Sequence, residues 1–143
     1  MMHLALAAAP VDTGDTAWMI VCTALVLLMT PGLALFYAGM VRSKHALGMI
    51  MQNFATIAIV TVTWVVVGYS LAFDHDAAGG LVGGLHLVGL THAEVSVPGF
   101  NLTFPPLAFV MFQLMFAIVT AALISGASAD RMRFGSFVTF IAI

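Results

Sequence analysis

Charge is what this sequence has least of. Asp, Glu, Lys and Arg make up 7% of its 143 residues, whereas an ordinary soluble domain carries about 25%. Hydrophobic residues account for 62%, and the mean hydropathy is +1.13. A chain this apolar cannot cover its own surface with polar groups, so the composition excludes a soluble domain and favours a membrane protein. The net charge of −2 gives no support for a nucleic-acid partner.

Cysteine is nearly absent. Cys22 is the single one, so no disulfide framework can form within the chain. The ten methionines invite a copper site through Met49 and Met51 or through Met111 and Met115, but methionine more often fills gaps between packed helices. We therefore predict no metal and no cofactor. The sequence also shows no paired nucleophile and base, which argues against an enzyme.

Long uncharged runs are what the sequence does have. Residues 17–41, 46–73 and 105–129 each exceed the ~20 residues that cross a hydrocarbon core as a helix. A fourth apolar run, 134–143, is too short to span. These runs predict an all-α, polytopic integral membrane bundle with three complete transmembrane helices and the beginning of a fourth. On this interpretation the chain is a fragment, cut within its fourth helix.

Residues 1–16 are assigned to an extracytoplasmic tail. This segment is apolar and contains a cleavage-site-like Ala7-Ala8-Ala9, but it lacks the basic start of a signal peptide. Two interpretations stay open, a signal-peptide remnant and a short exported tail.

The basic residues predict the orientation. All four lie in two loops, Arg42 and Lys44 after the first helix and Arg131 and Arg133 after the third. Three threaded helices place both loops on one side, which the positive-inside rule makes cytoplasmic. The N-terminus is therefore expected outside, with the acidic residues except Asp130 on its side.

The outer loop, 74–104, carries histidines and aspartates that could suggest a metal site. Asp74-His75-Asp76, His86 and His92 match no zinc or calcium spacing. Metal binding in this loop is therefore disfavoured.

Several polar and small residues inside the spans suggest helix packing. Pro31, with Gly32 and Gly39, predicts a kink and a close-packing surface on the first helix. Gln52 and Asn53 are expected to face the protein interior, as packing contacts in preference to pore-lining groups.

The third helix carries a stripe of interest. At 100° per residue, Phe112, Phe116, Val119 and Leu123 lie on one face. The two rings can attract a small cation. The aliphatic track beyond them would repel that ion but admit a neutral molecule. On the stripe alone, ordinary packing of these side chains is the stronger interpretation.

Blocks of sequence resemble the Amt/Rh family of ammonium transporters. The segment 22–39, CTALVLLMTPGLALFYAG, resembles the family's first helix, and 64–73, WVVVGYSLAF, the end of its second. The residues Phe112-Gln113 and Phe116-Ala117, followed by 126–134, GASADRMRF, resemble the third helix and the loop after it. The family more often has Glu where Asp130 stands. The similarity covers nearly everything after Asp15.

The resemblance implies roles for four side chains. Phe116 matches the family's outer-gate phenylalanine, and Phe112 an aromatic residue of the outer recruitment vestibule. Leu123 matches an apolar pore-lining position, and Leu33 is assigned the same role. The family's two pore histidines, its vestibule tryptophan and its second gate phenylalanine match nothing here, and the resemblance puts them beyond residue 143.

The resemblance also implies a function. Ammonium is recruited at an outer aromatic vestibule and ammonia crosses an apolar pore, in a homotrimer of eleven-helix subunits in the bacterial inner membrane. A PII-type signal protein on the cytoplasmic face is an implied partner. The alternatives are an Amt-like membrane sensor or receptor fused to a signalling module, and a small structural membrane subunit.

The orientation can be tested by cysteine labelling in a Cys22→Ala background. We expect a membrane-impermeant thiol reagent to label a cysteine at position 80, but not at position 44, in intact cells. Labelling at 44 without labelling at 80 would reverse the orientation.

Overall fold

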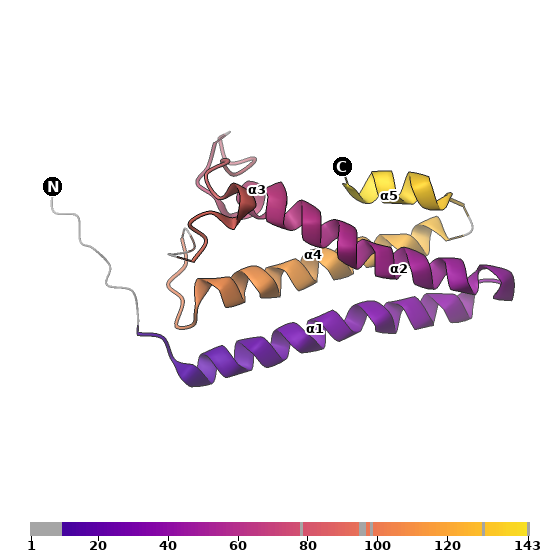
Figure 1. The fold of residues 1–143 in the computed structure, drawn as a ribbon, viewed down its shortest axis with the longest axis horizontal. Helices are drawn as coiled ribbons and strands as arrows, with labels where there is room; N and C mark the ends of the chain where they lie inside the picture. Colours follow the sequence, from indigo (N-terminus) through magenta and orange to yellow (C-terminus); the bar gives the residue numbers. More distant parts are fainter. Residues whose placement is uncertain (1–9, 78, 95–96, 98, 130, 143) are drawn as a thin grey trace, which may run out of the picture.

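The computed structural model describes residues 10–77, 79–94, 97, 99–129 and 131–142, which form an antiparallel helical bundle (Figure 1). In chain order the elements are α1 (Thr13–Met40), α2 (Ser43–Thr63), the π-helical η1 (Trp64–Gly68), α3 (Tyr69–Phe73), the 3-10 turn η2 (Val88–Leu90), α4 (Pro106–Ser128) and α5 (Phe134–Ala142). Within these described ranges, the extended pairing is a single bridge between Asp76 and Gly83. The expectations on Ala7-Ala8-Ala9 and on Asp130 fall outside the described residues.

Three helical segments are long and apolar enough to cross a membrane: Thr13–Met40, Ser43–Phe73 and Pro106–Ser128. This confirms the prediction of three spanning helices. The second span combines α2, η1 and α3, because a π-helical turn joins the two α-helical parts. Its backbone hydrogen bonds remain within the segment, as hydrocarbon requires.

The first helix begins earlier than expected. Residues 13–16, assigned to the tail, form the first turn of α1, because the Asp12 side chain caps the helix by accepting from the Asp15 backbone N–H at 2.9 Å. An acidic cap accepts a hydrogen bond from a free N–H group at the start of a helix, and its negative charge interacts favourably with the helix dipole. The polar run before the apolar one is therefore helical.

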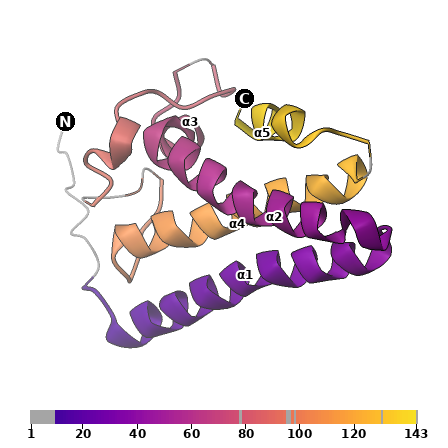
Figure 2. The same cartoon turned by 45° about the vertical axis from the view of Figure 1, so that its right-hand side comes forward.

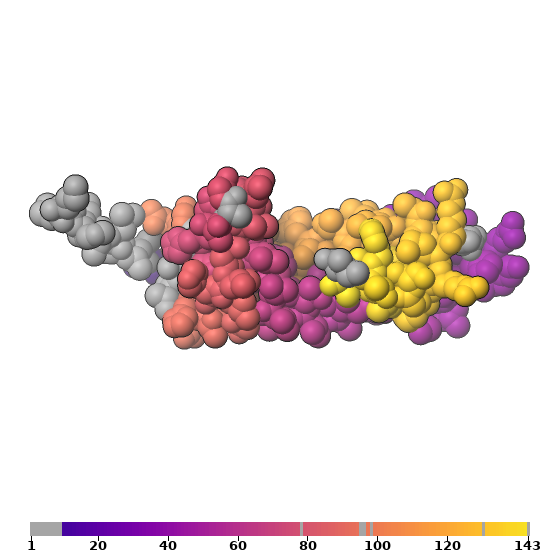
Figure 3. All heavy atoms as spheres, turned by 90° about the horizontal axis from the view of Figure 1, so that it is seen from above, coloured from indigo at the N-terminus to yellow at the C-terminus, as the bar shows by residue number. Residues whose placement is uncertain are grey.

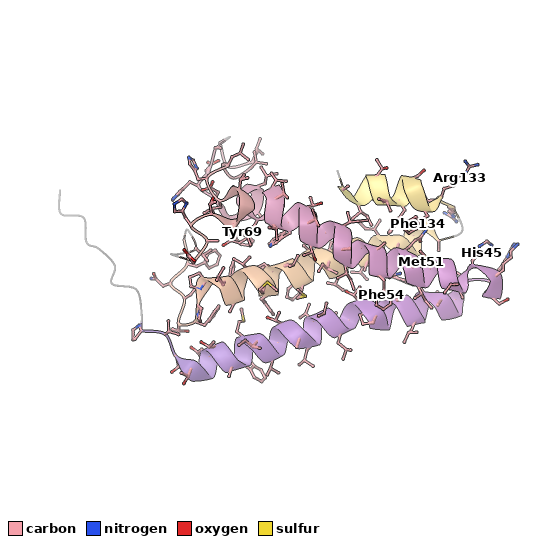
Figure 4. The ribbon with its side chains drawn as sticks, in the orientation of Figure 1. His45, Met51, Phe54, Tyr69, Arg133 and Phe134 are labelled. Atoms are coloured by element: carbon pink, nitrogen blue, oxygen red, sulfur yellow. The ribbon has the colours of Figure 1, made fainter. Side chains whose placement is uncertain are left out.

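The two basic loops lie at one end of the bundle. At the opposite end, the start of α1 is joined to the segment before α4 by a hydrogen bond from the Asp12 backbone N–H to the Thr103 carbonyl, 2.7 Å. Figure 4 shows His45 and Arg133 at the basic end and Tyr69 towards the other. The structure thus separates basic and acidic loops along the long axis.

The interior lies between α1, α2 and α4. Val60 of α2 packs with Leu114, Met115 and Ile118 of α4, and Val26 of α1 closes the cluster. α5 packs mainly against α2 (Figures 1 and 2).

The first helix is packed differently from the prediction. α1 runs without a break through Pro31, and an added Cβ at Gly32 or Gly39 would meet nothing within 4 Å. Among the described residues, no helix packs closely against these two glycines, so the expected close-packing surface is not formed within this part of the chain. These glycines lie on the side of α1 that no described element covers, whereas Thr30 and Ala34 face the interior.

The outer loop folds back onto the end of α3, where Asp74 organises it. Its carboxylate accepts the backbone N–H of His75 at 2.7 Å and that of His86 at 2.6 Å, with the His86 ring Nδ1 at 3.1 Å. Ser70 Oγ donates to the Gly84 carbonyl at 2.8 Å. Gly83 passes so close that a Cβ there would lie 2.6 Å from the Ser70 carbonyl oxygen. Seen from above, the loop and α5 project on one face at opposite ends (Figure 3).

The Asp74 side chain is 1% exposed. Desolvation opposes its ionisation, but the two backbone N–H groups and the His86 ring together outweigh it and hold the pKa of Asp74 below 3.8. A lowered folded-state pKa stabilises the fold above the ordinary value and ceases to do so as pH falls through the folded value.

The structure of this loop favours position 81 over position 80 for the cysteine-labelling experiment. Gly80 has φ of 90°, a conformation that a cysteine adopts only with strain. The neighbouring Leu81 is 86% exposed and is therefore the better outer position.

We predict that Asp74→Asn loosens the loop. Each carboxylate oxygen accepts one backbone N–H, whereas an amide offers a single accepting oxygen, so one N–H loses its partner. At pH 5, pepsin should cut residues 79–94 several-fold faster in this variant. The difference should shrink as the pH falls through the lowered pKa of Asp74, because the parental carboxylate then becomes protonated as well. Glu94→Gln is the charge-matched control and should cut like the parent; equal rates for Asp74→Asn and the parent at pH 5 would contradict this role.

Candidate functional site

One arc of α4 is left uncovered by the other described helices. Phe116 is 42% exposed and Leu123 50% exposed, and Thr120 and Ala127 are also exposed. These four positions are three or four residues apart, so they form one stripe along the helix. The opposite side of α4 is buried against α1 and α2. We call the uncovered stripe the open face of α4.

Two aromatic rings stand at the outer part of the open face. The rings of Phe112 and Phe116 are 4.9 Å apart and nearly perpendicular, at 73°, the edge-to-face geometry that aromatic pairs prefer. Phe112 is half-buried at the edge of the face. Because α4 runs from the loop 74–104 towards the basic end of the bundle, Phe112 lies one turn closer to that loop, about 6 Å along the axis.

Val119 is a correction to the predicted stripe. It is 5% exposed and lies on the closed side of α4. The reason is seen at Gly126, which lies two turns after Val119 on the same side of α4. A Cβ at Gly126 would lie 2.6 Å from Tyr37 Cζ of α1, so this azimuth is the seam between α1 and α4.

Tyr37 of α1 contacts α4 in this seam, next to the open face. Its hydroxyl donates to the Leu123 carbonyl at 3.4 Å, a long hydrogen bond, and its ring covers Gly126. Leu33, half-buried, stands one turn before Tyr37 on the same side of α1. Sequence reasoning missed Tyr37 as a contact, although an aromatic hydroxyl within an apolar span signals a polar partner.

The outer end of α4 is held by a second aromatic group. Phe109 packs against Phe73 at 5.1 Å and against Phe100 at 5.3 Å, and Phe73 stacks on Tyr69 at 5.3 Å. Phe109 is buried, although it shares its azimuth with Phe116 two turns further in. The open face therefore begins below this cluster, at Phe112 and Phe116.

The described residues contain no group of three or more His, Cys, Asp or Glu that could hold a metal ion. The open face carries one hydroxyl, that of Thr120, which donates to the Phe116 carbonyl at 2.7 Å. This face thus presents two rings and aliphatic groups, with its hydroxyl hydrogen already engaged.

The family model described as the Ammonium Transporter Family matches residues 17–143. This chain belongs to the ammonium transporter family. It is 51% identical over 145 residues to an ammonium transporter of Mycobacterium tuberculosis (strain H37Rv), with 90% of this chain and 30% of the relative covered. It is 50% identical over 127 residues to one of Bacillus subtilis (strain 168), with 89% and 31% covered. The chain spans about a third of the length of these relatives.

Solved structures agree with the family. The crystal structure of Saccharomyces cerevisiae Mep2 matches with a TM-score of 0.81 at 34% identity, covering 92% of this chain and 29% of that one. Candida albicans Mep2 matches with a TM-score of 0.81 at 33% identity and the same coverage. The bundle is therefore an N-terminal part of this fold, and the family is one of transporters, not enzymes.

We predict that Gly126→Ala destabilises the α1–α4 seam. The added methyl would push the Tyr37 ring aside and break its contact with Leu123, at a cost of about 1–3 kcal/mol for overpacking. The test protein is a chimera in which this chain replaces the matching segment of the Bacillus subtilis relative, and the measurement is thermal unfolding in detergent. Gly32→Ala is the matched control, since its Cβ meets open space. Equal unfolding temperatures for the two variants would contradict a close-packed seam.

Proposed function

We propose that this chain supplies the outer gate and part of the pore of an ammonium transporter. The observation that carries the proposal is the open face of α4. It sets the Phe112–Phe116 ring pair above an aliphatic stripe in a span that three other helices leave uncovered on one side.

The ring pair is suited to recruiting ammonium. A small cation over an aromatic face gains roughly 0.5–2 kcal/mol, and more when it is partly desolvated. Phe112, the outer ring, serves recruitment. Phe116, one turn further in, closes the pore to the outside.

The stripe below the rings is suited to a neutral molecule. Leu123 lies about 10 Å further along the helix axis than Phe116, and Leu33 is assigned to the same apolar lining. An ion moved into such surroundings pays several kcal/mol or more, whereas neutral ammonia pays far less. Ammonium therefore gives up its proton above this stripe, and ammonia crosses it. The proton passes to a base that the family resemblance puts beyond residue 143.

The proposal extends to assembly and location. The complete transporter is a homotrimer of eleven-helix subunits in the bacterial inner membrane, with its N-terminus outside. The basic end of the bundle, with Arg42, Lys44, Arg131 and Arg133, faces the cytoplasm. A PII-type signal protein docks on that side.

The recruitment role is tested with Phe112→Ala in the chimera. Loss of one ring should weaken the apparent affinity for methylammonium a few-fold to about thirty-fold, the ratio that corresponds to ~0.5–2 kcal/mol. The measurement is concentration-dependent uptake of labelled methylammonium. Phe112→Leu, which keeps the apolar bulk without the ring, should show the same loss.

Phe54 provides the control, because it is an exposed aromatic residue on α2 and not on α4 (Figure 4). Phe54→Ala should leave the apparent affinity unchanged. An unchanged affinity in Phe112→Ala, with normal expression and trimer formation, would assign Phe112 to packing alone. Absence of uptake by the unsubstituted chimera would overturn the proposed function itself.

A further inference from the structure

A buried hydrogen bond joins α2 to the back of α4. Asn53 Nδ2 donates to Ser125 Oγ at 3.1 Å and to the Met49 carbonyl of its own helix at 2.9 Å. Ser125 Oγ in turn donates to the Ala122 carbonyl at 2.7 Å. Both side chains are 0% exposed. This hydrogen bond thus fixes α2 relative to α4 at this level.

The position of Ser125 on α4 relates this bond to the pore. Ser125 follows Phe116 by nine residues, which places it about 180° around the helix from that ring. It follows Leu123 by two residues, about 3 Å along the axis. The bond therefore holds α4 from directly behind the open face, at the depth of Leu123.

The buried amide of Asn53 has one pairing group left over among the described residues. Its Oδ1 is buried and has no hydrogen-bond partner among the described residues, and an unpaired buried acceptor costs free energy, most of all inside a membrane. An apolar residue of similar size would avoid that cost. A polar group kept under such a cost can serve to select one packing arrangement over others.

We propose that Asn53 is a positioning residue for the pore: through Ser125 it sets the rotation of α4 and thereby the placement of Leu123 in the apolar lining. The proposal rests on the proposed function for its consequence in transport. Phe112 and Phe116 lie towards the N-terminal end of α4, about 20 Å and 14 Å along the axis from Ser125, and the aromatic cluster at Phe109 holds that end independently. The bond therefore controls conduction past Leu123 and leaves recruitment unaffected.

The test combines transport with substitution of each partner in the chimera. Asn53→Leu and Ser125→Ala should each lower the maximal rate of methylammonium uptake about three-fold or more, a rise of roughly 0.6 kcal/mol in the transport barrier. The apparent affinity should stay within two-fold of the parent. The double variant should transport no worse than either single variant, and the exchanged pair, Asn53→Ser with Ser125→Asn, should recover most of the rate.

Thr56→Val is the matched control. Thr56 is as buried as Asn53 and lies one turn away on the same helix face, but its hydroxyl donates within α2, to the Gln52 carbonyl at 2.9 Å. It should keep the parental rate. An unchanged rate in Asn53→Leu, an equal loss in Thr56→Val, or strictly additive losses in the double variant would each overturn the positioning role.

A second measurement does not depend on transport. In the Cys22→Ala chimera, a thiol reagent should modify Leu123→Cys faster than Val119→Cys, because position 123 is exposed on α4 and position 119 is buried. Adding Asn53→Leu should bring the two rates closer, and Thr56→Val should not. An unaltered ratio in the Asn53→Leu background would overturn the proposal even in a chimera that fails to transport, so its failure is distinct from failure of the proposed function.

Discussion

A peptide group that leaves water for hydrocarbon must find its hydrogen-bond partner within the protein. This constraint determines the form of the chain, because only a helix satisfies a single segment by itself. It also explains the side chains that remain polar inside the bundle. Thr56, Thr61 and Thr63 return their hydroxyls to carbonyls of their own helix. Asn53 instead donates to Ser125 on another helix. That hydrogen bond forms only when α2 and α4 are placed correctly relative to each other.

The same constraint gives α4 two sides with different requirements. On its closed side, Gly126 leaves room for the Tyr37 ring. Leu114 and Ile118 make the aliphatic contacts of that side. Along its open face, the side chains change from aromatic at Phe112 and Phe116 to aliphatic at Leu123. Under the proposed function, a cation recruited at the rings would meet a rising desolvation cost at the stripe. Under the proposed function, the open face would contribute to selectivity through its arrangement along one helix, with no charged group among Phe116, Thr120, Leu123 and Ala127.

The outer end shows how a loop rich in glycine can still be ordered. Asp74 uses both carboxylate oxygens to hold the chain at His75 and His86, and Gly83 allows the loop to lie against the last turn of α3. Beneath it, Phe73, Phe100 and Phe109 fill the space at the start of α4. The ring pair of the open face therefore stands below a packed aromatic layer.

The sequence by itself determined the number of spanning helices, the segregation of basic loops to one end and the family, because length, hydropathy and ordered motifs are local properties. It also placed Phe112 and Phe116 on one helix face, since a 3.6-residue period is intrinsic to the helix. Only the tertiary structure decided which side of each helix is covered. Val119 belongs to the predicted stripe by period but lies in the seam with α1, Gly32 and Gly39 face outward, and Tyr37, Asp74 and the Asn53–Ser125 pair emerged as contacts. These depend on the rotation of each helix about its axis, which nearly uniform hydrophobicity around the helix leaves undetermined until neighbouring side chains pack.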